Sequence, residues 1–246
     1  MKINDLFSVK DRTVVITGCS SGIGLQLAKG FILNEAKVIG LSRSRPLEKL
    51  NFMNFYECDL TNKTDIDSVV QKLKSKKVKI NSLLNVAGIS LGKSSNEDEM
   101  DRFDRTINLN LRAVYELIYV LKPFYTNGTS IINFSSIGGY LGFPGNPSYC
   151  ASKGALLSLS KALANDLAPQ NIRVNSILPG YFHTKMTSSS FSKPKEKKLR
   201  ENRTILGRWG ELNELVGISI FLASEASSYI TGSELVVDGG WVSKGL

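Results

Sequence analysis

The chain has 246 residues, of which 42% are hydrophobic and 22% are charged. This length and composition are typical of one folded α/β domain and exclude a repeat or low-complexity architecture. No run approaches the roughly 20 apolar residues of a membrane span, and the N-terminus does not resemble a secretory signal. The net charge of +9 comes without the motifs of nucleic-acid binding, so we expect neither a nucleic-acid nor a membrane partner.

Six short apolar runs alternate with longer helical patterns along the chain. The runs are TVVIT from Thr13, KVIGL from Lys37, SLLNVAG from Ser82, SIINFSS from Ser130, RVNSIL from Arg173 and ELVVDGG from Glu234. Continuous apolar runs are typical of parallel strands buried on both faces. The alternation predicts an α/β fold, a Rossmann-type doubly wound parallel sheet, in a single domain spanning residues 1–246. A ligand crevice is expected at the carboxyl ends of the strands.

Five helices are predicted between these strands. They begin in the glycine turn near Gly22, near Thr64 where TDID resembles a capping box, at Asp101, at Ser148 as an N-cap, and near Glu211. The helix from Asp101 to Leu121 carries Asn110 on its apolar stripe. Because a buried amide is costly without a partner, Asn110 should have a specific hydrogen bond, and a purely structural asparagine is the alternative.

A glycine-rich turn, TGCSSGIG, directly follows the first strand. A tight strand-to-helix turn brings backbone close to phosphates, and a helix N-terminus attracts their negative charge. A plain turn would also account for the glycines. We expect a dinucleotide here, in contact with Gly18, Ser20, Ser21, Gly22, Ile23 and Gly24.

The end of the second strand, in VIGLSRSR, indicates which dinucleotide fits. Ser42 stands where an NAD-binding site would have a carboxylate for the ribose 2′-hydroxyl. Arg43 can donate to a 2′-phosphate, and the hydroxyls of Ser42 and Ser44 add donors. The sequence therefore favours NADP(H) over NAD(H), with an ordinary exposed loop arginine as the alternative interpretation.

Four segments in order resemble motifs of the short-chain dehydrogenase/reductase family. They are TGCSSGIG from Thr17, NVAG from Asn85, YCASK from Tyr149 and LPGYFHT from Leu178. The closing segments, including LGRWG and VDGGW, are similar to the 3-oxoacyl-[acyl-carrier-protein] reductase branch, and the match covers nearly the whole chain. Departures from the family pattern are Val86, in place of an asparagine, and Ile205, where proline is usual. The resemblance implies a ketoreductase or alcohol dehydrogenase of class EC 1.1.1.-, working on a carbonyl or secondary alcohol.

The resemblance also implies a catalytic tetrad of Asn110, Ser136, Tyr149 and Lys153, with no metal. Tyr149 would be the general acid or base, Ser136 would hold the substrate oxygen, and Asn110 would anchor a proton-relaying water. Lys153 lies one helical turn after Tyr149, so its charge is expected to lower the phenol's pKa from about 10. Ser135 is expected to satisfy backbone groups.

Further cofactor contacts are carried over from the family. They are Asp59, Leu60, Asn85, Ala87, Gly88, Tyr149, Lys153, Pro179, Gly180, Phe182 and Thr184, with Lys153 on the nicotinamide ribose. His183, the only histidine, is expected to be incidental. Family habit implies a homotetramer or homodimer.

Three scattered cysteines, Cys19, Cys58 and Cys150, lack metal-site spacing. An odd number of separated thiols is typical of a reducing compartment, so we expect a cytoplasmic protein in which none of them is catalytic.

Two basic clusters occupy Lys72–Lys79 and Lys193–Arg203, and solvated helix faces are the simplest interpretation of both. Substrate is expected to meet Gly92–Glu97 and a polar, mobile covering segment at 187–204. The second cluster lies in that segment and would favour an anionic or carrier-bound substrate. Two alternatives stay open: an NAD+-dependent alcohol dehydrogenase of a biosynthetic pathway, and a nucleotide-binding sensor without turnover.

Overall fold

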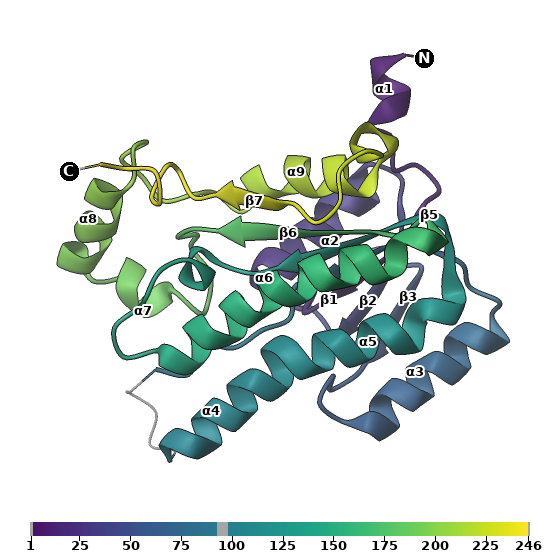
Figure 1. Cartoon of the computed structure of the whole chain (residues 1–246), viewed down its shortest axis with the longest axis horizontal. Helices are drawn as coiled ribbons and strands as arrows, with labels where there is room; N and C mark the ends of the chain where they lie inside the picture. Colours follow the sequence, from purple (N-terminus) through teal and green to yellow (C-terminus); the bar gives the residue numbers. More distant parts are fainter. Residues whose placement is uncertain (1, 93–97, 246) are drawn as a thin grey trace.

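The computed structural model describes residues 2–92 and 98–245 and has the predicted fold class. Within these ranges seven parallel strands form one sheet flanked by helices (Figure 1). The strands are β1 Thr13–Thr17, β2 Lys37–Ser42, β3 Asn54–Glu57, β4 Ile80–Asn85, β5 Tyr125–Phe134, β6 Arg173–Pro179 and β7 Glu234–Val237. The sequence predicts all of them except β3, whose four residues include two polar ends and give no apolar run.

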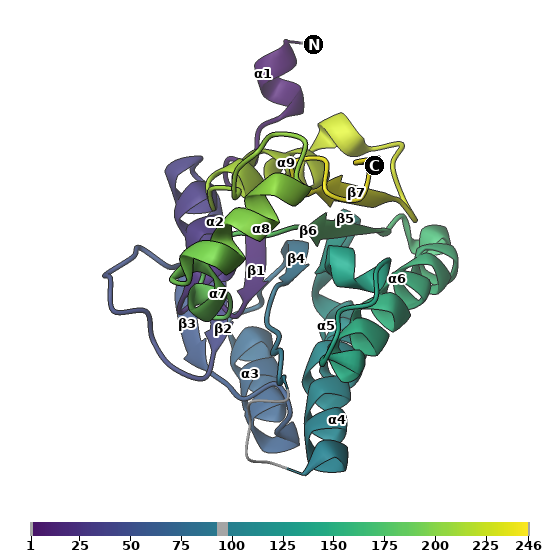
Figure 2. The same ribbon diagram turned by 90° about the vertical axis from the view of Figure 1, so that its left-hand side faces the viewer.

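Helices cover both faces of this sheet. The described α-helices are α1 Ile3–Leu6, α2 Gly22–Leu33, α3 Lys63–Ser75, α4 Glu99–Ile107, α5 Ala113–Leu121, α6 Pro147–Leu167, α7 Ser188–Phe191, α8 Pro194–Arg203 and α9 Glu214–Ala223, with a π-helical turn at Asn108–Arg112 between α4 and α5. Figure 2 shows α2 and α9 on one side of the sheet and α3 to α6 on the other. No described helix combines the length and apolar character needed to span a membrane.

Two hydrophobic cores lie against the two faces of the sheet. In β1, Val15 belongs to the core under α3, α5 and α6, whereas Val14 and Ile16 belong to the core under α2 and α9. Since successive strand residues point to opposite faces, burial on both sides requires an uninterrupted apolar run. The apolar runs of the sequence follow from this two-sided burial.

Four predicted helix starts differ from the structure, and one of them is that of α4, which begins at Glu99 instead of Asp101. The cap of α3 is Asn62 rather than Thr64, since Oδ1 of Asn62 accepts from the backbone N–H of Thr64 at 2.9 Å. Helix α6 begins at Pro147, so Ser148 lies inside it and is not the N-cap; proline suits a first helical position because its missing N–H would be unpaired there. Helix α9 begins at Glu214, three residues after the predicted start.

The strand order is β3-β2-β1-β4-β5-β6-β7, so the chain reverses its direction of growth between β1 and β4. Loops after β1 and β4 therefore leave the sheet toward opposite faces and open a crevice between them. Helices α7 and α8 lie beyond the carboxyl ends of the strands, as Figures 1 and 2 show.

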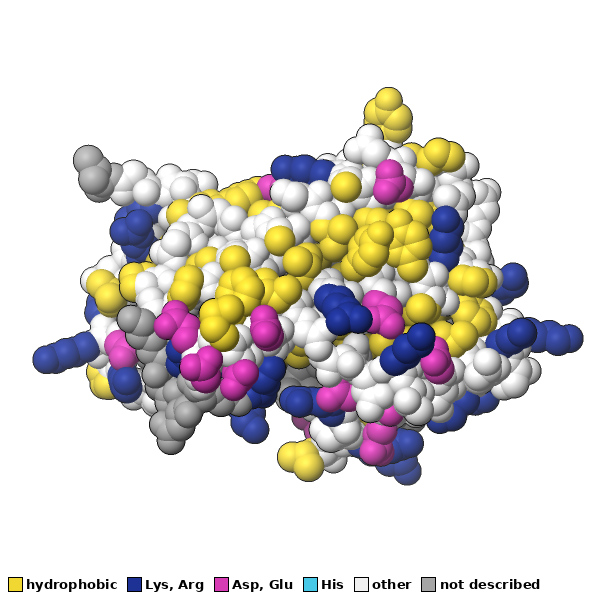
Figure 3. Space-filling model, turned by 60° about the horizontal axis from the view of Figure 1, so that its bottom comes forward, with side chains coloured by type: hydrophobic (Ala, Val, Ile, Leu, Met, Phe, Trp, Pro, Cys, Tyr) yellow, Lys and Arg dark blue, Asp and Glu magenta, His cyan; other side chains and the backbone are white. Residues whose placement is uncertain are grey.

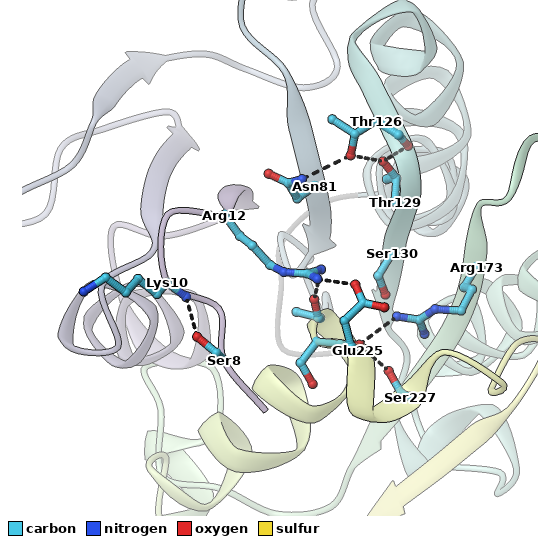
Figure 4. Close-up of polar contacts among 12 residues, drawn as sticks. Ser8, Lys10, Arg12, Asn81, Thr126, Thr129, Ser130, Arg173, Glu225 and Ser227 are labelled. Carbon is cyan, nitrogen blue, oxygen red and sulfur yellow. Dashed lines mark hydrogen bonds and ion pairs between the residues drawn. The ribbon is translucent and has the colours of Figure 1, made fainter. Parts of the chain in front are cut away.

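The amino ends of the strands are fastened by a polar network around the end of α9 (Figure 4). Buried Arg173 donates to the carbonyl oxygens of Leu222 at 2.8 Å and Ile230 at 3.2 Å. Arg12 donates to the carbonyl of Ala223 at 3.0 Å and pairs with Glu225. These guanidinium groups satisfy carbonyls that a helix C-terminus leaves without intrahelical partners.

Candidate active site

A cleft of about 530 Å³ opens at the reversal point of the sheet. Fourteen of the twenty predicted cofactor contacts line it: Gly18, Ser20, Ser21, Gly22, Ile23, Gly24, Ser42, Arg43, Ser44, Asp59, Leu60, Ala87, Gly88 and Thr184. They come from the segments after β1, β2, β3, β4 and β6, which the sheet brings to one edge. The cleft is of a size that suits a cofactor.

The glycine turn lets backbone approach the cleft closely. Gly18 has a φ of +67°, and a Cβ there would lie 2.9 Å from Cα of Ala87. A Cβ on Gly24 would lie 2.4 Å from the carbonyl oxygen of Gly18. Ser21, at the N-cap of α2, makes no side-chain capping bond, so the first turn of the helix keeps its N–H groups for an anion.

A polar cluster of opposite charges lies where the cleft passes β2 and β3. The hydroxyl of Ser42 donates to that of Ser20 at 2.9 Å. Burial would raise the pKa of Asp59, but hydrogen bonds from Thr61 and the charge of Arg43 outweigh burial and lower it. Arg43 and Asp59 are thus close enough to interact.

Thr17, at the end of β1, ties the glycine turn to the turn after β4. Its Oγ1 accepts from the backbone N–H groups of Val86 at 2.9 Å and Ala87 at 3.0 Å. These bonds hold two lining segments of the cleft at a fixed distance. Val86, a departure from the family pattern, needs only its backbone for this contact.

Tyr149 lies on the first turn of α6, and its pKa is raised. Burial is the main cause, while the hydrogen bond with Ser136 lowers the pKa by less. The hydroxyl of Ser136 also accepts from the N–H of Gly138 at 3.0 Å. The sequence predicts a lowered pKa for Tyr149, but the net shift is upward, because burial outweighs the hydrogen bond with Ser136.

Lys153 points into the protein with only 5% of its surface exposed. Its Nζ donates to the carbonyl oxygen of Phe134 at 2.8 Å and lies 5.9 Å from the centre of the Tyr149 ring. Burial lowers the pKa of Lys153 to about 8. Ser135, as predicted, satisfies a backbone group: its hydroxyl donates to the carbonyl of Lys153 at 2.8 Å.

Asn110 is fully buried in the π-helical turn, and the predicted partners are found. Its Oδ1 accepts from the N–H of Ile89 at 2.8 Å, while Nδ2 donates to the carbonyl of Ile89 at 2.9 Å and to Ser152 at 3.1 Å. A Cβ on Gly88 would lie 3.2 Å from Oδ1 of Asn110 and 3.4 Å from Nζ of Lys153. The tetrad therefore adjoins the cleft at Gly88.

Six predicted cofactor contacts do not line the cleft. Tyr149 and Lys153 lie at its end, as described above. The amide of Asn85 is buried and donates to Asn133 at 2.8 Å. Pro179 ends β6, Gly180 packs on Asp238, and the Phe182 ring is buried against Gly210.

The cleft also has lining residues that the sequence reasoning missed: Leu41, Cys58, Thr61, Val86, Ile89, Arg105, Asn108, Leu109, Lys185 and Met186. Lys185 and Met186 directly follow the LPGYFHT segment, so their place next to Thr184 was a usable signal. Arg105 and Asn108 had no such signal, because helical periodicity does not indicate which of these positions meets the cleft. Burial raises the pKa of the Cys58 thiol to about 11, as expected for a residue without a catalytic role.

The expected substrate-covering segment, 187–204, forms α7 and α8. Five rings in mutual contact form what we call the aromatic wall: Phe143, Tyr181, Trp209, Trp241 and, within the segment itself, Phe191. His183 stacks on Phe191 with ring centres 3.9 Å apart, which anchors α7. Of the other expected substrate segment, only Gly92 is among the described residues; positions 93–97 lie outside them.

This fold and cleft are those of an oxidoreductase that binds a nicotinamide dinucleotide. The chain matches the family model described as enoyl-(acyl carrier protein) reductase over residues 18–242, and it belongs to the short-chain dehydrogenase/reductase family. It is 35% identical to the 3-oxoacyl-[acyl-carrier-protein] reductase FabG of Thermotoga maritima, over 95% of this chain and 99% of that one.

Two solved structures are similar to this one. A gluconate 5-dehydrogenase from Burkholderia cenocepacia, in complex with NADP and tartrate, has a TM-score of 0.89 and 27% identity, covering 99% of this chain and 100% of its own. A 4-hydroxyisoleucine dehydrogenase complexed with NADH has a TM-score of 0.88 and 31% identity, covering 96% and 100%. Similar proteins thus carry either nicotinamide dinucleotide.

Proposed function

We propose that this protein is an NADP(H)-dependent oxidoreductase that interconverts a ketone or aldehyde and an alcohol. The observation that carries the proposal is the convergence of Ser136, Tyr149, Lys153 and Asn110 at the end of a dinucleotide-sized cleft. When bound there, the nicotinamide would supply or accept the hydride. The rest of the reaction concerns the proton on the substrate oxygen.

In this proposal Tyr149 transfers that proton. Its raised pKa keeps the phenol protonated at neutral pH, which is the form that carbonyl reduction requires. Ser136, hydrogen-bonded to Tyr149, would donate to the same oxygen as negative charge develops on it. A cation near the phenol stabilises the tyrosinate, so Lys153 favours proton release. Asn110 would hold the water through which Lys153 exchanges its proton with solvent.

The preference for NADP(H) is proposed from the residues around the adenosine end. Ser42 lies where an acid would repel a 2′-phosphate, its hydroxyl meets that of Ser20, and Arg43 lines the same part of the cleft. An arginine can bind a phosphate with two parallel hydrogen bonds. The charge of Arg43 also helps to lower the pKa of Asp59, so the two side chains interact favourably.

We expect Arg43→Asp to reverse the cofactor preference. Loss of a charge-assisted hydrogen bond and the added repulsion should weaken NADPH binding by roughly 100-fold, while NADH binding is kept or improved. Fluorescence titration with the two cofactors measures both affinities. Arg45→Gln is the matched control, because Arg45 pairs with Glu57 and stacks on Phe55 instead of lining the cleft. Equal loss in both variants would contradict the assignment.

The alternatives make different predictions. An NAD+-dependent alcohol dehydrogenase would bind NADH more tightly than NADPH in the parent protein. A sensor without turnover would bind NADPH and leave its absorbance unchanged in the presence of a panel of diketones. Neither a disulfide nor a metal enters the proposal, and the cytoplasmic location expected from the sequence stays a prediction.

The substrate is proposed only by class. FabG and gluconate 5-dehydrogenase are named for substrates attached to an acyl carrier protein and for a sugar acid, respectively. The basic residues of α8 would suit either one. Two ion pairs partly neutralise that helix. Nζ of Lys193 lies 3.1 Å from Oε1 of Glu196, and Nζ of Lys197 lies 3.5 Å from Oε1 of Glu201. These pairs leave less positive charge for a large acidic carrier.

A further inference from the structure

Arg200 lies on the side of α8 that faces the aromatic wall. Its guanidinium carbon is 5.0 Å from the centre of the Tyr181 ring. Its side chain is 19% exposed, against 42% for Lys197 one turn earlier on the same helix. The guanidinium of Arg200, packed over this ring, is therefore largely shielded from solvent.

The hydrogen bonds of this guanidinium leave one edge unused. Nη1 donates to the carbonyl oxygen of Glu196 at 3.0 Å and lies 3.4 Å from Oε2 of Glu196. Nε is buried, and no described residue accepts a hydrogen bond from it. Buried N–H groups of arginine nearly always have acceptors, since leaving one unpaired is costly. The edge formed by Nε and Nη2 is one of the two edges that bind a carboxylate with parallel hydrogen bonds.

Arg200 and Tyr149 are connected through the rings of the aromatic wall. Tyr181, under Arg200, is near enough to Tyr149 to raise its pKa. The centres of the Phe143 and Tyr181 rings are 6.2 Å apart. The Phe143 and Tyr149 rings both border Gly138, because a Cβ added there would lie 3.0 Å from Phe143 and 3.2 Å from Tyr149. Arg200 and Tyr149 therefore both border the aromatic wall.

We propose that Arg200 binds a carboxylate on the substrate through Nε and Nη2, while Tyr149 meets the carbonyl or alcohol oxygen. The substrate class is then a small oxo acid or hydroxy acid. This inference rests on the proposed function, since it names the substrate of the same site. Trp209 and Trp241, with centres 5.3 Å and 4.8 Å from that of Tyr181, exclude water from the ion pair and strengthen it. A substrate bound to a carrier through a thioester has no carboxylate at that end, so it could not form this ion pair with Arg200.

The test compares oxo acids with neutral analogues of the same length. Pyruvate, acetoacetate, 4-oxopentanoate and 5-oxohexanoate, each beside its methyl ester, vary the distance between carbonyl and carboxylate. We expect kcat/KM with NADPH to favour one or two acids over their esters. Arg200→Met should lower that value for the acids by roughly 100-fold and change it for the esters by no more than about threefold. Arg203→Gln, an exposed arginine over Trp241 on the same helix, should leave both unchanged.

A second measurement does not depend on turnover. Both tryptophans of the chain border Tyr181, so their fluorescence should report an oxo acid binding to the NADP+-saturated protein, in the parent but not in Arg200→Met. Equal kcat/KM for acids and esters in the parent, or equal losses in Arg200→Met, would overturn this inference and leave the proposed function intact. Oxo-acid binding that depends on Arg200, without reduction of any compound, would support the inference and contradict the proposed function.

Discussion

Lys153 and Tyr149 are buried side by side, and burial acts on both in the direction of the neutral form. The pKa of the phenol rises and that of the ammonium falls to about 8. Keeping Lys153 charged at neutral pH costs folding free energy, which a purely structural residue would avoid. This is the pattern expected where a site gives up stability for proton chemistry.

The cost of burying Lys153 predicts a pH-dependent stability difference. Its pKa is about 8 when folded and 10.5 when unfolded, so between these values the unfolded chain binds more protons and stability rises with pH. Lys153→Met should be more stable than the parent below pH 8. The advantage should shrink by an amount on the order of 3 kcal/mol by pH 10.5, at 1.4 kcal/mol per pKa unit.

Urea unfolding of both proteins at pH 7.5 and at pH 10 measures this change. A constant difference between the two proteins across that range would show that the Lys153 pKa is not lowered.

At the residue scale, the sequence predicts what short motifs determine. The glycine turn, the absence of an acid at Ser42 and the amide of Asn110 are each interpretable from neighbours along the chain. Arg200 and the aromatic wall are not, because their rings come from four separate segments that meet only in the folded protein. The net upward shift of the Tyr149 pKa does not follow from the YCASK spacing either, because burial is a property of the surroundings.

At the element scale, the turn between α4 and α5 has a functional position. Sequence periodicity predicts one continuous helix from Asp101 to Leu121, but Asn108–Arg112 is π-helical. Such turns are frequent at functional sites because they redirect a side chain within a helix. Here the turn contains Asn110, whose amide bonds the backbone of Ile89 beside the cleft. Helical periodicity does not indicate such an insertion.

The capping of α9 carries a stability prediction. Arg173→Met removes hydrogen bonds from a buried guanidinium to the carbonyls of Leu222, Ser224 and Ile230. Each of these carbonyls keeps a second donor, so the expected loss is moderate, about 2 kcal/mol in urea unfolding. Arg12→Met, at a more exposed site of the same network, should cost less. Cofactor affinity should not change, since the network lies at the opposite ends of the strands; a loss of NADPH binding without unfolding would count against this account.

At the scale of the whole molecule, exposed hydrophobic side chains gather on one face. Figure 3 shows them gathered over the face of α4, α5 and α6. Met100, Phe103, Tyr115 and Tyr119 are each more than a third exposed there. Such a patch on a folded protein indicates a contact surface, and family habit suggests a second copy of the chain.

We therefore expect light scattering to give two or four times the chain mass of 27.0 kDa. Replacing Tyr115 and Tyr119 together with Glu should lower the measured mass, whereas Leu47→Glu, on a different exposed loop, should not. A parent protein that runs as a monomer at all concentrations would disprove the contact.

The fold was predictable at this scale because burial on both faces of a parallel sheet imposes a long-range pattern on the sequence. Six of the seven strands follow from it. Strand β3 did not, since an edge strand needs no continuous apolar run, and the exposed face of α4 to α6 did not, since it depends on how helices pack.

In the proposed reaction the cleft and the tetrad together carry out hydride transfer to a carbonyl, with Tyr149 as the acid. The most direct measurement uses NADPH deuterated at the transferring carbon, with mass spectrometry of the alcohol formed from the oxo acids and diketones above. The account predicts one non-exchangeable deuterium per product in the parent. It also predicts a rate lower by roughly 1,000-fold in Tyr149→Phe, with NADPH affinity retained. Tight NADPH binding with no deuterium in any product, or an unchanged rate in Tyr149→Phe, would contradict it.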